Sequence, residues 1–201
     1  MSKNEIRMKV WKLMEEKGIA TFPKPVVHRI PNFIGAEKAA QNLRQLSEYE
    51  RAQVVFCNPD SPQRAVREMT LKDGKILVVA TPRLKHGFLV IAPEITAGKE
   101  RFASTIKGAF KYGKETAAFP KPDLIVTGSV AVDKDGNRLG KGRGYGDREI
   151  EMIQEKFGNV LVATTIHDVQ LVEYAPSTPL DEKVDVIVTP TKIIRVGHDK
   201  R

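Results

Sequence analysis

Apolar residues recur along this chain in two patterns, short continuous runs and helical stripes, and the two alternate. Short apolar or β-branched runs predict strands over residues 53–57, 75–81, 88–92, 123–127, 160–166 and 185–189. Helical periodicity and capping residues predict helices over residues 3–17, 36–46, 61–69, 99–112 and 147–157. The last three strands are continuously apolar rather than alternating, so both of their faces are expected to be covered. The pattern therefore predicts the α/β class, with a mostly parallel sheet between helices.

Length and composition are those of one enzyme-sized domain. The chain has 201 residues, of which 41% are hydrophobic, and no linker, internal repeat or low-complexity tract divides it. We therefore expect a single domain over residues 1–201. The longest apolar runs, such as residues 76–80 and 88–92, are far too short to cross a bilayer, and the first residues carry no signal-peptide stretch. No membrane partner is predicted.

The single cysteine, Cys57, bears on both compartment and chemistry. It rules out an internal disulfide and the clustered thiols of a structural zinc site, so a cytoplasmic location is expected. Cys57 ends a predicted strand, where a nucleophile could stand, but a free cysteine is more often a small buried hydrophobe. No histidine pair has metal-ligand spacing among the four histidines, His28, His86, His167 and His198.

The charge balance favours a polyanionic partner. Lys and Arg number 33 against 25 Asp and Glu, which gives a formal net charge of +8 at pH 7. A solvated surface explains such an excess equally well. Nucleic acid is possible but not favoured, because only 6% of residues are aromatic and neither zinc-finger spacing nor an RNA-binding signature is present.

Residues 137–147, NRLGKGRGYGD, combine alternating glycines with cationic side chains. Glycines let successive backbone N–H groups turn toward one concavity, and cations beside them hold a polyphosphate. Asp147 closes the loop where a magnesium ion would require a carboxylate. The phosphate-binding residues that this pattern predicts are Arg138, Gly140, Lys141, Gly142, Arg143, Gly144 and Gly146.

The surroundings of this loop decide how it is interpreted. Its spacing fits neither the dinucleotide fingerprint nor the Walker A loop, which would require glycines at Tyr145 and Asp135 respectively. In isolation the segment could be a simple glycine-rich turn. However, a predicted strand (residues 123–127) precedes it and a predicted helix (residues 147–157) follows it. That order places the loop at a helix N-terminus, which is a favourable position for an anion.

The same segment carries a family resemblance. Residues 128–133 and 136–145, followed by Asp147, resemble the signature of the 5-formyltetrahydrofolate cyclo-ligases, also called methenyltetrahydrofolate synthetases. Residues 3–7 are similar to the opening segment of that family, and residues 180–189 resemble its C-terminal segment. The resemblance implies a three-layer αβα fold related to sugar-phosphate isomerases and CoA transferases.

Short segments elsewhere resemble one divergent branch, the methenyltetrahydrofolate synthase domain-containing proteins. These segments are residues 30–33, 81–84, 128–132, 166–170 and 189–191. Two features depart from the pattern of the cyclo-ligases. Gly146 stands where relatives have the second tyrosine of Gly-Tyr-Tyr-Asp, and no Glu-Pro pair precedes the predicted strand at residues 123–127.

The resemblance implies a ligase of one-carbon metabolism that depends on ATP and magnesium. Such an enzyme converts 5-formyltetrahydrofolate to 5,10-methenyltetrahydrofolate and releases ADP and phosphate, as a monomer or homodimer. It implies that Lys3 and Arg7 hold ATP phosphates together with residues 138–146, here called the glycine loop, which adds Leu139 and Tyr145 to the ATP-binding residues. It further implies catalytic roles for Lys141, Arg143 and Tyr145, and magnesium ligation by Asp147 and Asp181.

Three functions stay open on the sequence alone. They are a folate cyclo-ligase, an ATP-dependent enzyme with another acceptor, and a nonenzymatic nucleotide- or RNA-binding protein. Taken alone, Lys3 and Arg7 would fit a solvated helix face, and Asp181 would fit a turn. Their joint occurrence with the glycine loop favours an enzyme.

Overall fold

The computed structural model describes residues 1–197, so His198 and the last residues of the predicted domain lie outside the described part. The α-helices are α1 (Lys3–Glu16), α2 (Ala36–Arg44), α3 (Ser47–Arg51), α4 (Arg64–Lys72), α5 (Glu100–Ala103), α6 (Ile106–Tyr112) and α7 (Tyr145–Phe157). The strands are β1 (Val54–Cys57), β2 (Ile76–Ala80), β3 (Phe88–Ile91), β4 (Lys114–Thr116), β5 (Leu124–Thr127), β6 (Ala131–Val132), β7 (Arg138–Leu139), β8 (Val162–Thr165), β9 (Val186–Val188) and β10 (Ile193–Arg195). Short 3₁₀ turns are η1 (Ser61–Gln63), η2 (Pro82–Leu84), η3 (Pro93–Thr96) and η4 (Asp168–Gln170).

The main sheet of the described chain has eight strands in the order β10-β9-β8-β5-β1-β2-β3-β4. Strands β9, β8, β5, β1 and β2 are parallel to their neighbours in this series. The pairs β2–β3, β3–β4 and β9–β10, toward the two edges, are antiparallel. The predicted α/β class with a mostly parallel sheet is confirmed.

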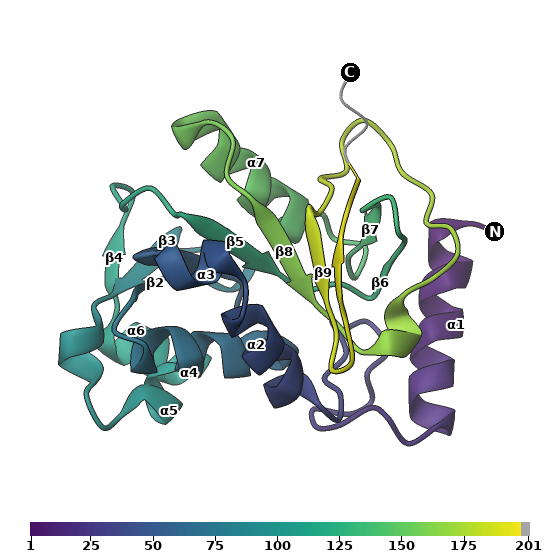
Figure 1. The fold of residues 1–201 in the computed structure, drawn as a ribbon, viewed down its shortest axis with the longest axis horizontal. Coiled ribbons are helices and arrows are strands. Elements are labelled where there is room, and N and C mark those ends of the chain that lie inside the picture. Colours follow the sequence, from purple (N-terminus) through teal and green to yellow (C-terminus); the bar gives the residue numbers. More distant parts are fainter. Residues whose placement is uncertain (198–201) are drawn as a thin grey trace.

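Helices cover both faces of this sheet because its central strands are apolar on both sides. In β1, Val55 and Cys57 pack into the core cluster that contains Leu43 of α2. The alternate residues of the strand, Val54 and Phe56, pack into the cluster on the other face, which includes side chains of α7. Figure 1 shows α2, α4 and α6 on one side of the sheet and α7 on the other. This arrangement explains the continuous apolar runs.

A smaller unit at one end of the molecule positions the N-terminal helix. Strands β6 and β7 form a separate antiparallel pair. The buried side of α1, which includes Trp11 and Met14, packs in one cluster with Ala131 of β6 and Leu139 of β7. In Figure 1, α1 stands beside this small sheet. The glycine loop begins at β7, so this packing brings α1 to the loop.

The predicted helix over residues 99–112 is interrupted in the structure. It forms two short helices, α5 and α6, because the Thr105 hydroxyl caps α6 by accepting a hydrogen bond from the Gly108 N–H at 2.9 Å. The two helices also cross closely, since a Cβ atom at Gly108 would lie 1.9 Å from the Phe102 carbonyl oxygen. A single continuous helix was therefore a wrong prediction.

Two other helices differ from the prediction in detail. Helix α7 begins at Tyr145 rather than at Asp147, so both residues lie in its first turn. On α1, helical spacing predicts a buried stripe of Ile6, Val10, Leu13 and Met14, but Leu13 is only half-buried and Trp11 is buried instead. The Trp11 indole N–H donates to the Arg29 carbonyl at 3.0 Å, which satisfies its polar group in the interior.

Candidate active site

A cavity of about 600 Å³ lies between α1, the glycine loop and the segments that follow β1 and β2. Its walls contain every residue predicted above to bind phosphate or magnesium: Lys3, Arg7, Arg138, Leu139, Gly140, Lys141, Gly142, Arg143, Gly144, Tyr145, Gly146, Asp147 and Asp181. The fold thus brings together residues from distant parts of the chain. Their binding roles stay predictions.

The glycines of the loop meet two different requirements. Gly142 (φ 92°) and Gly144 (φ 70°) adopt the left-handed conformation that other residues disfavour. Gly140 and Gly146 instead leave room for Arg138, because a Cβ atom at either would lie 3.3 or 3.2 Å from its guanidinium nitrogens. Gly144 is also the N-cap of α7. The unpaired N–H groups and dipole of that helix end attract anions.

Arg138 lies almost fully buried beneath the loop, with 4% of its surface exposed. One terminal nitrogen donates to the Gly128 carbonyl at 3.0 Å, and the other donates to Asp147 Oδ1 at 2.6 Å. Its Nε atom is buried without a hydrogen-bond partner among the described residues. Arg138 therefore orients Asp147 and places positive charge under the loop.

Helix α1 closes one side of the cavity through two contacts. Arg7 Nε donates to the Gly140 carbonyl at 2.7 Å, and the Lys3 ammonium forms an ion pair with the Asp181 carboxylate. Burial lowers the pKa of the Arg7 guanidinium, while the nearby Asp181 and Asp147 carboxylates act in the opposite direction. The predicted Lys3 and Arg7 pair is thus joined to both the loop and the C-terminal segment.

Asp147 and Asp181 are the predicted magnesium ligands, and the contacts of their carboxylate oxygens show how far each is already engaged. Asp147 Oδ1 accepts hydrogen bonds from Arg138 and from the Glu182 N–H, the latter at 3.1 Å. Asp181 Oδ2 accepts from Lys3 and from the N–H and hydroxyl of Thr178 at 2.6 and 2.8 Å. In the described structure these contacts use one oxygen of each carboxylate.

The donor set suits a magnesium ion shared with a polyphosphate. Among the described residues, no three His, Cys, Asp or Glu side chains form a complete metal cage. Magnesium commonly binds proteins through one or two carboxylates and takes its other ligands from water and substrate phosphates. Burial favours a higher pKa for Asp181, but hydrogen bonds from Lys3 and Thr178 outweigh it and leave the pKa below its ordinary value. Asp181 is therefore ionised and available to a cation.

The three predicted catalytic residues lie in different surroundings. Lys141 Nζ donates to Asp60 Oδ1 at 2.8 Å, so its ammonium is held toward the end of β1. Arg143 is exposed at the loop, and no ion pair joins it to another described residue. Tyr145 is half-buried at the first position of α7. All three line the cavity.

Two acidic residues of the cavity, Asp60 and Glu149, were not predicted from the sequence. Asp60 follows β1, and ligands of open α/β sheets bind beyond the carboxyl ends of the strands, a signal that would have found it. Glu149 lies on the buried side of α7 next to Ile150 and one turn before Ile153. A charged residue within an apolar helical stripe is the signal that would have singled it out.

Glu149 has an unusual electrostatic environment. Burial raises its pKa to about 8; the Asp60 carboxylate adds to this effect, and Arg138 and Lys141 oppose it. Only 5% of its surface is exposed, and the side chain lines the cavity. Within residues 1–197 no hydrogen bond or ion pair reaches its carboxyl group.

Two residues near the cavity mouth have a strained backbone. His28 (φ 65°) and Arg83 (φ 59°) are non-glycine residues in the left-handed region, and both line the cavity. Such strain concentrates at functional sites, where surrounding contacts maintain it. Neither residue was assigned a binding role from the sequence.

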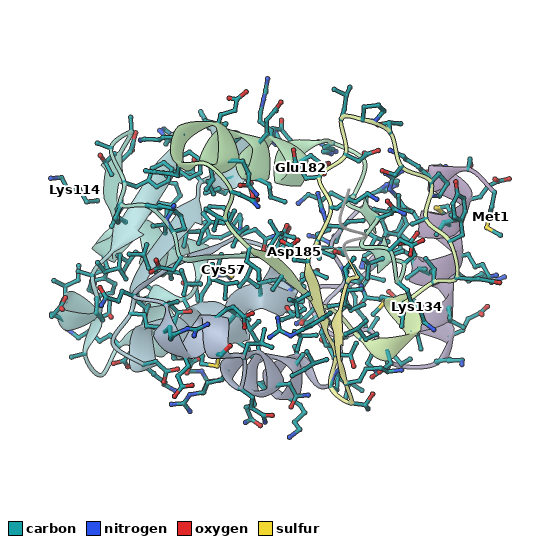
Figure 2. All side chains as sticks on the ribbon, turned by 45° about the horizontal axis from the view of Figure 1, so that its top comes forward. Met1, Cys57, Lys114, Lys134, Glu182 and Asp185 are labelled. Carbon is teal, nitrogen blue, oxygen red and sulfur yellow. The ribbon has the colours of Figure 1, made fainter. Side chains whose placement is uncertain are left out.

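Cys57 is not part of the site. It is completely buried, its thiol donates to the Gln63 carbonyl at 3.7 Å, and burial raises its pKa to about 12. Figure 2 shows Cys57 among packed side chains in the middle of the molecule. The interpretation of Cys57 as a buried hydrophobe is confirmed.

Comparison with known proteins identifies the family. The sequence profile of the 5-formyltetrahydrofolate cyclo-ligase family matches residues 1–190. The chain belongs to this family. The expected family resemblance is therefore confirmed. Within residues 1–197, no helix is both long and apolar enough to span a bilayer.

Two mammalian relatives support the expected branch. The methenyltetrahydrofolate synthase domain-containing protein of Bos taurus is 40% identical over 212 residues, which cover 100% of this chain and 55% of the relative. The Homo sapiens protein of the same name is 41% identical over 209 residues, covering 98% of this chain and 54% of the relative. The chain thus spans about half the length of the curated relatives it matches.

A solved structure with a cyclo-ligase fold is similar to this chain. The NMR structure of Aquifex aeolicus 5,10-methenyltetrahydrofolate synthetase superimposes with a TM-score of 0.63 at 22% identity. The match covers 100% of this chain and 96% of that chain. The likeness supports the fold assigned above.

Proposed function

We propose that this protein is a cytoplasmic ligase that uses ATP and magnesium to convert 5-formyltetrahydrofolate to 5,10-methenyltetrahydrofolate, with residues 1–201 acting as one domain. The observation that carries the proposal is the single cavity that gathers the glycine loop, the N-terminus of α7, and the side chains of Lys3, Arg7, Asp147 and Asp181. Family membership supports the folate acceptor.

The proposed reaction is a phosphoryl transfer followed by ring closure. The formyl oxygen of the substrate attacks the terminal phosphorus of ATP, and the bond from that phosphorus to ADP breaks. The second folate nitrogen then adds to the formyl carbon and loses its proton. The C–O bond breaks with departure of phosphate, which leaves the methenyl bridge. Both substrates must therefore meet within one cavity.

The protein contributes position and charge to this chemistry. Backbone N–H groups of the loop and of the α7 N-terminus are suited to hold the phosphates, with Lys141 and Arg143 as additional cations. Asp147 and Asp181 would hold magnesium, which neutralises phosphate charge when bound. Arg138 keeps Asp147 in place from below.

Two measurements test the proposal. ATP with magnesium at about a hundred times its dissociation constant should stabilise the fold by roughly 2.7 kcal/mol, which is visible as a higher melting temperature. Absorbance should show methenyltetrahydrofolate only when ATP and magnesium are both supplied. An unchanged melting temperature at millimolar ATP and magnesium would remove the nucleotide half of the proposal.

A second candidate is an ATP-dependent enzyme with another acceptor. The observation that favours it is Gly146, which offers no aromatic ring at the place where relatives have a second tyrosine. The Gly146→Tyr variant distinguishes the two. The φ angle of Gly146 lies outside the left-handed region, but a new side chain would press on Arg138, whose nitrogens lie 3.2 Å from the Cβ position. Faster folate turnover by the variant would show that only the ring was missing.

If the unmodified chain turns over 5-formyltetrahydrofolate rapidly, the second candidate is wrong. If both forms bind ATP but neither turns over the folate, a different acceptor is favoured. A nonenzymatic nucleotide- or RNA-binding protein would bind its ligand and hydrolyse no ATP with any acceptor.

A further inference from the structure

The cavity has an acidic wall that the phosphate chemistry does not use. Asp60 and Glu149 provide its carboxyl groups, one after β1 and one on α7. The Asp60 carboxylate is fully engaged, because Oδ1 accepts from Lys141 at 2.8 Å and Oδ2 accepts from Asn58 Nδ2 at 3.0 Å. The Glu149 carboxyl group, in contrast, has no hydrogen-bond partner among the described residues.

Glu149 combines burial with a lack of partners. It is 5% exposed and lines the cavity, yet no hydrogen bond from residues 1–197 reaches its carboxyl group. A buried carboxyl without a hydrogen bond costs free energy in the folded protein. No described residue donates to it and the side chain lines the cavity, so its oxygens are open to a donor group of a molecule bound there.

The chemistry of that molecule follows from what surrounds Glu149. The Asp60 carboxylate, whose charge acts on Glu149, repels a phosphate at this wall, so the phosphates of ATP do not supply the contact. Glu149 lies close enough to Arg138 and Lys141 to interact with their charges, which places it beside the phosphate-binding loop. The group that must approach a transferred phosphate is the second substrate.

The shape of a carboxyl group further limits the class of molecule that can bind to Glu149. In its ionised form, which bound N–H donors favour, the group has two coplanar oxygens that accept two parallel hydrogen bonds. Adjacent N–H groups on one edge of a planar ring match this pattern. A 2-amino-4-oxopyrimidine edge presents such a pair. A ring carrying only carbonyls or methylated nitrogens has no donor for Glu149.

We propose that Glu149 is a specificity residue of the acceptor subsite, where its carboxyl group accepts hydrogen bonds from the N–H edge of a nitrogen heterocycle. The inference rests on the proposed function in that it places the acceptor beside ATP. According to this inference, Glu149 determines which acceptor ring binds. The glycine loop holds phosphates and cannot select between acceptor rings.

The test compares two fluorescent probes in the presence of a nonhydrolysable ATP analogue and magnesium. One is pterin; the other is the 3-methyl-2-dimethylamino derivative, which lacks both N–H donors. The wild-type protein should bind pterin at least about tenfold more tightly than the methylated ring. Glu149→Met should abolish this preference, and Glu149→Gln, which keeps one acceptor oxygen, should retain part of it.

Two controls separate recognition from a structural role. Glu149→Met should leave the affinity for the ATP analogue within about twofold and should not lower stability, because it removes a buried unpaired carboxyl. Glu151→Met changes an exposed glutamate on the same helix and should preserve the preference for pterin. A structural role for Glu149 would instead lower stability in Glu149→Met.

The proposal is overturned by any of three results. The wild-type protein fails to prefer pterin or binds neither ring; Glu149→Met keeps the preference; or Glu149→Met loses affinity for the ATP analogue in parallel. Failure of the proposed function is separate. If the protein prefers pterin through Glu149 but forms no methenyltetrahydrofolate, the role of Glu149 is supported and the proposed reaction is wrong.

Discussion

Arg138 and Asp147 form a 2.6 Å ion pair that joins strand β7 to the first turn of α7. The Arg138 side chain is 2% exposed, whereas the Asp147 side chain is 22% exposed and lines the cavity. The buried guanidinium therefore depends on a carboxylate that the proposed magnesium ion also requires. Asp147 therefore contributes both to the stability of the fold and to the proposed magnesium site.

Replacing Asp147 by Asn should therefore weaken both stability and magnesium dependence. Loss of the counter-ion leaves a buried positive charge, which costs about 3 kcal/mol where a buried pair is broken. Urea denaturation measures the stability, and a magnesium titration of ATP binding measures the second effect. Asp135→Asn changes an exposed aspartate before β7 and serves as the control. Equal stability of the two variants would contradict the role assigned to the pair.

The double variant Lys141→Ala with Arg143→Ala should lose ATP affinity while the fold stays intact. Each charge-assisted contact to phosphate is worth about 1.5 to 3 kcal/mol, whereas the exposed Arg143 and the partly exposed Lys141–Asp60 pair add only about 0 to 1 kcal/mol to folding. Calorimetric titration with ATP and magnesium measures the change. A variant lacking the exposed cations Lys134 and Arg148 alters net charge equally outside the cavity. If both double variants bind ATP alike, general charge and not the loop explains the binding.

Gly144 should be replaceable by Asn at a lower cost than by Ala. Its φ of 70° is left-handed, and nothing lies within 4 Å of the position of an added Cβ, so the backbone alone decides the effect. Ala is expected to lower stability by about 1 to 2 kcal/mol, and Asn by less, because Asn tolerates this conformation. Chemical denaturation of the two variants checks the order. If Ala is tolerated better than Asn, the left-handed backbone does not govern this position.

Glu48 and Arg195 should stabilise the protein in a pH-dependent way. A hydrogen bond from Arg195 is the main cause that lowers the pKa of Glu48 to about 2, with Nη1 and Oε1 2.7 Å apart. The pair's contribution is thus fully present above the ordinary glutamate pKa and is lost as the pH falls through about 2. Because both side chains are partly exposed, Glu48→Gln should cost only about 0.2 to 1 kcal/mol at pH 7.

The measurement is the difference in unfolding free energy between wild type and Glu48→Gln at neutral and acid pH. The difference should shrink toward pH 2. Glu50→Gln, at an exposed position of the same helix, should show no such trend. A pH-independent difference would mean that the substitution acts through packing.

Cys57 should react with a thiol reagent only when the protein unfolds. Complete burial raises the pKa of its thiol to about 12, so little thiolate exists at pH 8 and no reagent reaches it. Labelling with a chromogenic disulfide in the native state and in urea checks this. Rapid labelling of the native protein would indicate local opening of the sheet around β1.

The central strands could be predicted from the sequence because burial on both faces leaves a continuous apolar signal. The edge strands could not. Lys114–Thr116 forms β4 although its side chains are polar and largely exposed, and its partner β3 supplies the backbone hydrogen bonds that define it. Strand β10 is likewise set by pairing with β9. Figure 2 shows Lys114 at the outer edge of the molecule.

The residues of the candidate site also differ in how far they could be predicted from the sequence. The glycine loop could be found from its own residues, since alternating glycines and cations carry a physical meaning in one segment. Lys3, Arg7 and Asp181 needed the family resemblance, because each has an ordinary surface role when taken alone. Asp60 and Glu149 were missed because their importance depends on what the folded chain places opposite them.

Lys3 pairs with Asp181, which lies 178 positions later in the chain. The two partners are therefore made at very different times during protein synthesis. A ribosome releases α1 long before it makes β7, the glycine loop or the segment that carries Asp181. During that interval α1 can pack only against segments that follow it closely, such as residues 20–39, while Ala131 and Leu139 are not yet made and the proposed ATP cavity is incomplete. The proposed nucleotide can therefore stabilise this protein only after the segment that carries Asp181, and with it nearly all of the described chain, has emerged.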